Sequence, residues 1–219
     1  MSFAAIFDWD GVIIDSSAQH ERSWEMLAAE INKPLPEGHF KRGFGKKNAV
    51  IIPEILGWAN DPAEVQALGD RKEELYRELV RRDGLTPLPG AEALLAVLNE
   101  AGVPCAVGSS TPRINIDTIC GMTGLDRFFK AVVTAEDVVH GKPAPDVFLT
   151  AASRLGAEPA RCVVFEDALV GIEAAHAGGM KCVAVATTNP LKLLGHAEIA
   201  VASLEEITVE RLRMMFGEG

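Results

Sequence analysis

Two aspartates at a spacing of two residues, Asp8 and Asp10, follow a short apolar run near the start of the chain. The run, residues 3–7, predicts a strand buried on both faces, and the spacing directs both carboxylates to the same side. Close like charges are costly unless a cation lies between them, and hard oxygen ligands suit Mg²⁺. The pair therefore indicates a magnesium site; the alternative is a pair of solvated loop acids, which most isolated Asp-x-Asp pairs are.

Further polar residues end predicted strands or precede a predicted helix, and they are Ser109, Lys142, Glu166 and Asp167. A phosphoryl group in transfer carries charge on three oxygens, so its transfer needs cations and hydrogen-bond donors around it. Lys142 would neutralise one side of such a group, and the Ser109 hydroxyl would hold another. We expect the Mg²⁺ ligands to be Asp8, Asp10, Asp167 and, directly or through water, Glu166.

The first aspartate also has the chemistry of a nucleophile. A carboxylate can attack phosphorus and form an aspartyl-phosphate, and we assign that step to Asp8. Asp10, two residues on, would protonate the leaving oxygen and later deprotonate water.

The elements that must position these groups alternate between strand and helix from residue 86 to the end of the chain. Alternation of this kind predicts βαβ crossovers and a parallel sheet, which the first strand must join. Residues 16–84 instead show helical periodicity without strands. We therefore expect an α/β core made of residues 1–15 and 85–219, with an all-helical module, residues 16–84, inserted directly after the aspartates.

Two features of the helical module suggest ligand binding. His20 lies on the apolar face of the first predicted helix, where a packed, hydrogen-bonded core residue is the alternative. Residues 41–48 collect four of the 21 Lys and Arg residues of the chain around two glycines. Exposed backbone N–H groups and positive charge predict an anion-binding loop there, with a solvated charge run as the alternative.

Composition limits the possible partners. Acidic residues outnumber basic ones 31 to 21, and the net charge of −10 argues against nucleic acid, which needs a basic face. No apolar stretch reaches the ~20 residues of a membrane span, and we expect no membrane association. The start of the chain lacks the features of a signal peptide, and the four cysteines show no CxxC spacing. We therefore expect buried, reduced thiols in a cytoplasmic protein, monomeric or alternatively dimeric.

In order and approximate spacing, four segments of the chain resemble the motifs of the haloacid dehalogenase (HAD) superfamily. They are Asp8-Trp9-Asp10-Gly11-Val12, Ser109, Lys142-Pro143-Ala144-Pro145-Asp146 and Glu166-Asp167. The resemblance implies a doubly wound, Rossmann-like α/β core with an inserted all-helical cap domain, and Mg²⁺-dependent phosphoester chemistry. The second aspartate of the first motif is similar to that of phosphatases and phosphomutases, whereas the dehalogenases lack it.

A finer resemblance is to the β-phosphoglucomutase-like and sugar phosphatase subgroup. Asp15, His20 and Trp24 stand as in that subgroup, and Gly43-Phe44-Gly45-Lys46 is similar to its phosphate-gripping cap loop. On that resemblance the substrate-binding residues are His20, Lys46, Ser110 and Arg113. The mutase has arginine where Lys46 stands, lysine where Pro112 stands and asparagine where Arg113 stands.

The sequence thus predicts a Mg²⁺-dependent phosphatase that hydrolyses a small phosphorylated metabolite, such as a sugar phosphate, through an aspartyl-phosphate. One alternative is a β-phosphoglucomutase-like phosphotransferase. Another is a catalytically silent protein that binds phosphorylated ligands and regulates a partner. The complete set of catalytic residues favours an enzyme over the silent protein.

Overall fold

The α/β part of the chain is built on a parallel sheet with strand order β3-β2-β1-β4-β5-β6. The computed structural model describes residues 3–43 and 45–218. The strands are β1 (Ala4–Phe7), β2 (Cys105–Gly108), β3 (Ala131–Val133), β4 (Cys162–Glu166), β5 (Lys181–Val185) and β6 (Ile199–Val201). The sequence predicts strands at residues 3–7, 103–107, 130–134, 161–165, 181–186 and 199–201, and the ends of each observed strand lie within two residues of the predicted ones.

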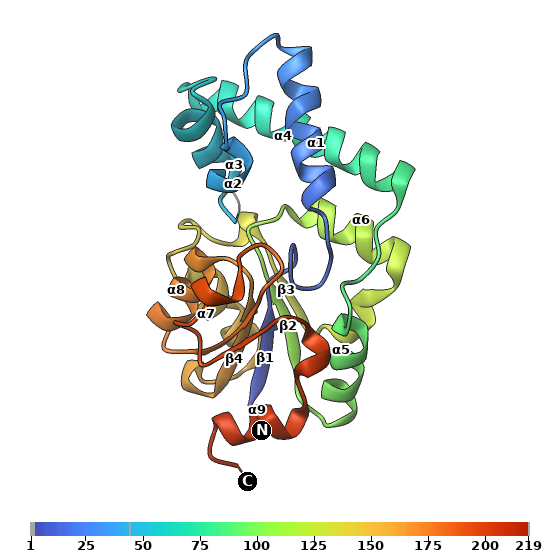
Figure 1. Cartoon of the computed structure of the whole chain (residues 1–219), viewed down its shortest axis with the longest axis vertical. Coiled ribbons are helices and arrows are strands. Elements are labelled where there is room, and N and C mark those ends of the chain that lie inside the picture. The colour runs from blue at the N-terminus through green and yellow to red at the C-terminus, as the bar shows by residue number, and fades with distance from the viewer. Residues whose placement is uncertain (1–2, 44, 219) are drawn as a thin grey trace. The chain divides into compact units, whose positions relative to one another are not determined.

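Helices cover both faces of this sheet. In order they are α5 (Ala91–Glu100), α6 (Arg113–Thr123), α7 (Asp146–Leu155), α8 (Leu169–Ala177) and α9 (Val209–Met215). Figure 1 shows α7 and α8 on one face and α5 and α6 on the other. The apolar sides of α7 and α8 close a continuous core with alternate residues of the strands, among them Ile6, Ala106 and Val164. This doubly wound arrangement confirms the predicted fold class.

The ends of two helices differ from the prediction. The sequence predicts a closing helix over residues 205–215, but Leu204–Glu206 forms a separate 3-10 turn and α9 begins only at Val209. Extended backbone at Ile207 interrupts the helical pattern, and the Thr208 side chain then caps α9 by accepting a hydrogen bond from the Arg211 N–H at 3.1 Å.

The other difference concerns Thr111, because Thr111 followed by Pro112 predicts an N-terminal cap for the helix after β2. Its hydroxyl instead donates a hydrogen bond to Asp10. The first N–H of α6, that of Arg113, donates to Glu136 at 3.1 Å, so a side chain distant in sequence satisfies the helix start.

The helical part, Ser16–Leu85, forms a compact unit separate from the unit made of Met1–Asp15 and Thr86–Gly219. Its helices are α1 (Ser17–Glu30), α2 (His39–Gly43), α3 (Asn48–Val50), a π-helical turn (Ile51–Leu56) and α4 (Pro62–Asp83). The described residues of this unit contain no strand, as predicted. No helix among residues 3–43 and 45–218 is both long and apolar enough to cross a membrane.

Packing of α1 on α4 forms the core of the helical unit. Leu27 and Leu75 are buried in it, and the Trp24 and Trp58 rings meet edge to face with centroids 5.9 Å apart. Asp61 caps the long helix α4 by accepting from the N–H groups of residues 63 and 64, and Pro62 follows at the first helical position. The sequence therefore specifies the start of α4 locally, whereas burial of its apolar face holds it in place.

Candidate active site

Three adjacent strands carry the predicted catalytic groups at their carboxyl ends. β1 lies between β2 and β4, and Phe7 pairs in register with Val107 on one side and Phe165 on the other. Asp8 follows β1 directly, and Glu166 ends β4. The order of strands reverses direction between β1 and β4, and open α/β sheets bind ligands at such switch points. The sheet itself therefore brings these carboxylates together.

Lys142 lies between two of the carboxylates. Its Nζ is 3.0 Å from Asp8 Oδ1 and 2.5 Å from Glu166 Oε1, and all three side chains are buried. Burial disfavours the ammonium, but the two carboxylates outweigh that effect and raise the pKa of Lys142. The lysine is thus a fixed positive charge at the end of β1.

Burial also changes the acidity of Asp8. It raises the pKa of Asp8 to about 6; Lys142 opposes the rise, while Glu166 and Asp10 add to it. A bound cation would reduce the repulsion between these carboxylates and favour the ionised form of Asp8.

Glu166 uses both of its oxygens within the protein. Oε1 accepts from Lys142, and Oε2 accepts from the backbone N–H groups of Asp167 at 2.8 Å and Ala168 at 2.7 Å. A Cβ atom at Gly171 would lie 1.8 Å from Glu166 Oε1, so only glycine leaves room for this carboxylate. Glu166 therefore positions Lys142 and the start of α8, and its role as a metal ligand stays a prediction.

Asp8, Glu166 and Asp167 form a group that fits a metal ion. Each offers one oxygen, and these oxygens lie within 4.8 Å of one another. Asp167 Oδ1 is buried and has no hydrogen-bond partner among the described residues. Burial and the neighbouring carboxylates raise the pKa of Asp167 well above its usual value. An unpaired buried oxygen among carboxylates fits a hard divalent cation, because such a cation would supply both a ligand bond and the missing positive charge.

Gly11 forms part of the wall beside Asp167. Its φ of 80° is in the left-handed region, and a Cβ there would lie 2.0 Å from Asp167 Oδ2. Glycine is required at this position for two reasons: the chain turns tightly after Asp8 and Asp10, and Asp167 approaches closely.

Asp10 is half-buried and is not a member of that group of three carboxylates. Its Oδ2 accepts a hydrogen bond from the Thr111 hydroxyl. The structure thus gives this carboxylate a fixed position beside β2, and its predicted roles as metal ligand and proton donor stay predictions.

The segment after β2 carries the other predicted groups of the α/β unit. Ser109 is buried, its N–H donates to Val133 O at 3.0 Å, and its Oγ accepts from the Thr111 N–H at 3.3 Å. Ser110, next to it, is half-buried. The Arg113 guanidinium donates to Val132 O at 2.6 Å and lies 3.5 Å from Asp137 Oδ2. These contacts hold Arg113 against β3, and its substrate-binding role stays a prediction.

His20 and Lys46 belong to the helical unit. The His20 ring stacks on Tyr76 with centroids 4.0 Å apart, and its Nδ1 lies 2.6 Å from Lys72 Nζ. Lys46 is half-buried, in the segment of residues 41–48 that was predicted to be an anion-binding loop. Residues 41–43 of that segment belong instead to α2, and Phe44 lies outside the described residues. Their substrate-binding roles also stay predictions.

The helical unit contains a buried charged pair that was not predicted from the sequence. Lys72 and Glu73 are both almost fully buried and lie 2.9 Å apart, and Asn48 donates to the same Glu73 oxygen at 2.7 Å. Burial opposes ionisation of Glu73, but Lys72 and His20 outweigh it and lower the pKa of Glu73. The sequence does indicate that Lys72 is buried, because residue 72 continues the apolar i, i+3, i+4 pattern of α4 between Leu68 and Leu75.

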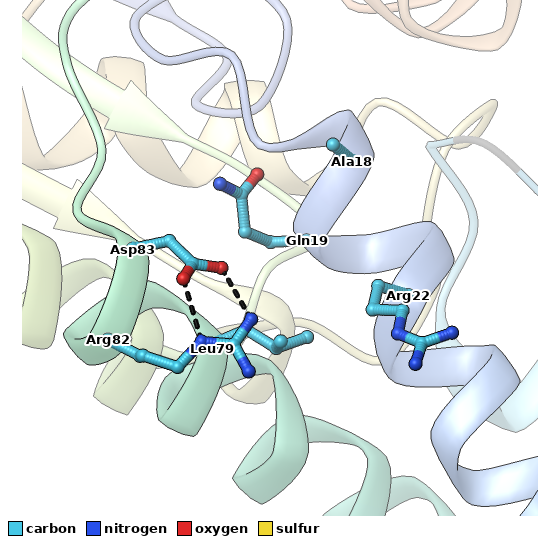
Figure 2. A pocket seen from close by; sticks show the side chains of 6 residues that line it. All are labelled: Ala18, Gln19, Arg22, Leu79, Arg82 and Asp83. Carbon is cyan, nitrogen blue, oxygen red and sulfur yellow. Dashed lines mark hydrogen bonds and ion pairs between the residues drawn. The ribbon is translucent and has the colours of Figure 1, made fainter.

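A separate surface pocket of about 290 Å³ lies between the start of α1 and the end of α4. Figure 2 shows its lining, in which the Arg82 guanidinium faces the Asp83 carboxylate. Arg82 makes two hydrogen bonds to Asp83, at 2.7 and 2.8 Å, and Arg22 pairs with Glu25 at 2.7 Å. Both arginines are thus already neutralised, and the pocket holds none of the predicted catalytic residues.

The contacts of two threonine hydroxyls with the predicted site were not expected from the sequence either. Thr111 donates to Asp10, and Thr188, in the loop after β5, donates to Asp167. Each stands three residues beyond the end of its strand. That shared spacing from the strand ends is the sequence signal for both hydroxyls.

Known proteins resemble this chain over most of its length. The chain is 39% identical over 214 residues to a 5-amino-6-(5-phospho-D-ribitylamino)uracil phosphatase from Arabidopsis thaliana, which covers 96% of the chain and 57% of that relative. It is 34% identical over 209 residues to hexitol phosphatase A from Escherichia coli, covering 94% and 93%. The structure of a β-phosphoglucomutase from Clostridium difficile superposes with a TM-score of 0.88 at 25% identity, over 100% of this chain and 98% of that one.

The first of these relatives is much longer than this chain, which spans little more than half of its length. A model of the haloacid dehalogenase-like hydrolase family matches residues 4–179, a range that includes every strand end described above except those of β5 and β6. The chain is therefore an enzyme of the haloacid dehalogenase-like hydrolase family, related both to phosphatases and to phosphomutases.

Proposed function

We propose that this enzyme is a Mg²⁺-dependent phosphatase that hydrolyses a small phosphorylated metabolite, of the sugar phosphate class, through an aspartyl-phosphate on Asp8. The observation that carries the proposal is the buried arrangement at the end of β1. There Lys142 is paired with Asp8 at 3.0 Å, and Asp8 shares a group of carboxylates with Asp167. Catalysis of phosphoryl transfer consists mainly of placing charges around the transferred group, and this arrangement supplies them.

Two displacements at phosphorus account for the reaction. A carboxylate oxygen of Asp8 attacks the phosphorus, the bond to the ester oxygen breaks, and Asp10 gives that oxygen its proton. Asp10 then takes a proton from water, the water oxygen attacks the phosphorus, and the bond to Asp8 breaks. The products are the free alcohol and inorganic phosphate, and both carboxylates return to their starting states.

Other residues hold the charge that moves during these steps. Lys142 supplies a positive charge next to the attacking oxygen, and Ser109 offers a hydroxyl at the end of β2. Mg²⁺, when bound by Asp8 and Asp167, supplies charge neutralisation on a phosphoryl oxygen. The unpaired buried Oδ1 of Asp167 supports its part in holding the ion.

The substrate class rests on the relatives. Their names describe phosphatases of a phosphorylated ribitylaminouracil and of a phosphorylated hexitol, and both compounds carry the phosphate on a polyol chain. A β-phosphoglucomutase-like transfer is the second candidate, favoured by the structural likeness to such an enzyme. Pro112 favours hydrolysis, because proline offers a bound phosphate neither a cation nor a backbone donor.

Asp8→Asn tests the catalytic assignment. We expect phosphate release from sugar phosphates to fall by about 10⁴-fold or more, since the nucleophile is lost. Glu198→Gln is a matched control, because Glu198 is a carboxylate of the same unit that pairs with His176 on the surface. Substantial turnover by folded Asp8→Asn, with an unchanged circular dichroism spectrum, would refute the assignment.

A second assay separates phosphatase from mutase. β-Glucose 1-phosphate is offered with a trace of the 1,6-bisphosphate, and glucose 6-phosphate and free phosphate are followed together. We expect phosphate release with at most minor isomerisation. Rapid formation of glucose 6-phosphate without matching phosphate release would make the enzyme a mutase.

A further inference from the structure

The loop that follows β5 contacts Asp167 twice. The Thr188 hydroxyl donates a hydrogen bond to Asp167 Oδ2, and the Asn189 side-chain amide donates to the Asp167 backbone carbonyl at 3.0 Å. The pairing of β5 with β4 causes this proximity, because Ala184 lies in register with Glu166 and both chains leave the sheet at the same edge. The loop after β5 thus contributes to the site, beyond the segments that carry the predicted catalytic residues.

The contact with Thr188 distinguishes the two oxygens of the Asp167 carboxylate. Oδ2 accepts from Thr188 and is closely approached by the backbone at Gly11. Oδ1 is equally buried but has no hydrogen-bond partner among residues 3–43 and 45–218. Exchange of the two equivalent oxygens would restore the same arrangement, but any partial rotation of the carboxylate would break the hydrogen bond from Thr188. The contact therefore holds Oδ1 as the oxygen that is left for a ligand.

We infer that Thr188 and Asn189 are positioning residues, which orient Asp167 to bind a divalent cation. The inference rests on the proposed Mg²⁺ site. Thr188 fixes the rotation of the carboxylate, and Asn189 fixes the backbone that carries it. Partners that orient a metal ligand in this way change metal affinity by about 10- to 100-fold when they are removed.

Titration of the substrate-free protein with MgCl₂ tests the inference, and the melting temperature is the readout. A cation that binds the folded state raises the melting temperature as the cation concentration increases. Thr188→Val keeps the shape of the side chain and removes its donor. We expect this variant to need about tenfold more Mg²⁺ than the wild type for the same rise in melting temperature. Asn189→Ala should shift the curve in the same direction by a smaller factor.

Two control variants separate positioning from a general loss of structure. Thr188→Ser keeps the donor and should follow the wild-type curve. Thr187→Val changes the same side-chain type one residue earlier, where the side chain is exposed, and should also leave the curve unchanged. Excess Mg²⁺ should restore phosphatase activity to Thr188→Val, because its defect lies in binding the ion.

The failure of this inference and that of the proposed function give different results. If Mg²⁺ stabilises the wild type but not Asp167→Ala, and folded Thr188→Val follows the wild-type curve, then the positioning role is refuted and the metal site stands. If Mg²⁺ stabilises neither the wild type nor Asp167→Ala, then the metal site and this inference are both refuted.

Discussion

Replacement of Gly171 by alanine should destabilise the protein, although alanine is the better helix former. Gly171 is the third residue of α8, and helix propensity alone predicts a gain of about 0.5–1 kcal/mol. The structure predicts the opposite, because a Cβ there would lie 1.8 Å from Oε1 and 1.9 Å from Cδ of Glu166. Ordinary contact needs about 3.5 Å. The carboxylate must therefore move by more than an ångström.

The size of the effect follows from what that movement breaks. Glu166 is fully buried, and it accepts hydrogen bonds from Lys142 at 2.5 Å and from two backbone N–H groups. Hydrogen bonds to charged groups contribute about 1.5–3 kcal/mol each, and overpacking costs about 1–3 kcal/mol. Partial relaxation recovers some of this loss. We expect the free energy of unfolding to fall by roughly 3–5 kcal/mol, in the range found when a buried ion pair is broken.

Urea denaturation of Gly171→Ala beside Gly121→Ala measures the effect with a matched control. Gly121 lies within α6, and a Cβ there would have no neighbour within 4 Å. That variant should be as stable as the wild type or up to about 1 kcal/mol more stable. If Gly171→Ala matches Gly121→Ala in its urea midpoint, the packing of Glu166 against α8 described above is wrong.

Three shorter predictions concern other parts of the chain. Partial burial would raise the pKa of Asp137, but hydrogen bonds from Arg154 and Thr134 outweigh it and lower that pKa to about 2. The stability that this carboxylate contributes should thus be complete above about pH 4 and vanish as the pH falls through 2. Equal differences in unfolding free energy between wild type and Asp137→Asn at pH 2.5 and pH 7 would contradict this. Asp61→Ala should lower the free energy of unfolding of the helical unit by about 1 kcal/mol, because α4 loses its N-terminal cap. Thermal unfolding of the helices measures this change, and a loss below about 0.3 kcal/mol would argue against the cap. The native protein should resist thiol reagents at pH 8 and react fully once unfolded, and a thiol that reacts within seconds in the folded state would contradict the burial of Cys105, Cys120, Cys162 and Cys182.

The sequence by itself determined the fold class and the main catalytic candidates. Apolar runs such as residues 3–7 are short and end in polar residues, and strands alternate with helices after residue 86. A parallel sheet is the arrangement that satisfies that alternation, and it brings the carboxyl ends of its strands to one edge. Asp8 and Asp167 could therefore be placed near each other without coordinates. Their chemistry follows from residue type, which is local information.

The tertiary structure alone decided which partners hold those groups. The Thr111 hydroxyl was expected to cap a helix but is bonded to Asp10, 101 residues earlier in the chain. Thr188 and Asp167 are 21 residues apart, and their contact depends on the pairing of β5 with β4. A cap and a cross-strand hydrogen bond satisfy the same hydroxyl equally well, and local sequence does not distinguish them.

The same reason explains the unexpected role of Gly171. In the sequence it is one small residue in a helical pattern, and nothing nearby marks it. In the structure it leaves the space that Glu166 occupies to hold Lys142. Periodicity and propensity describe how a residue suits its own helix or strand. Whether a Cβ fits, or which oxygen stays unpaired, depends on atoms from another segment, and only packing of the whole unit brings those atoms into contact.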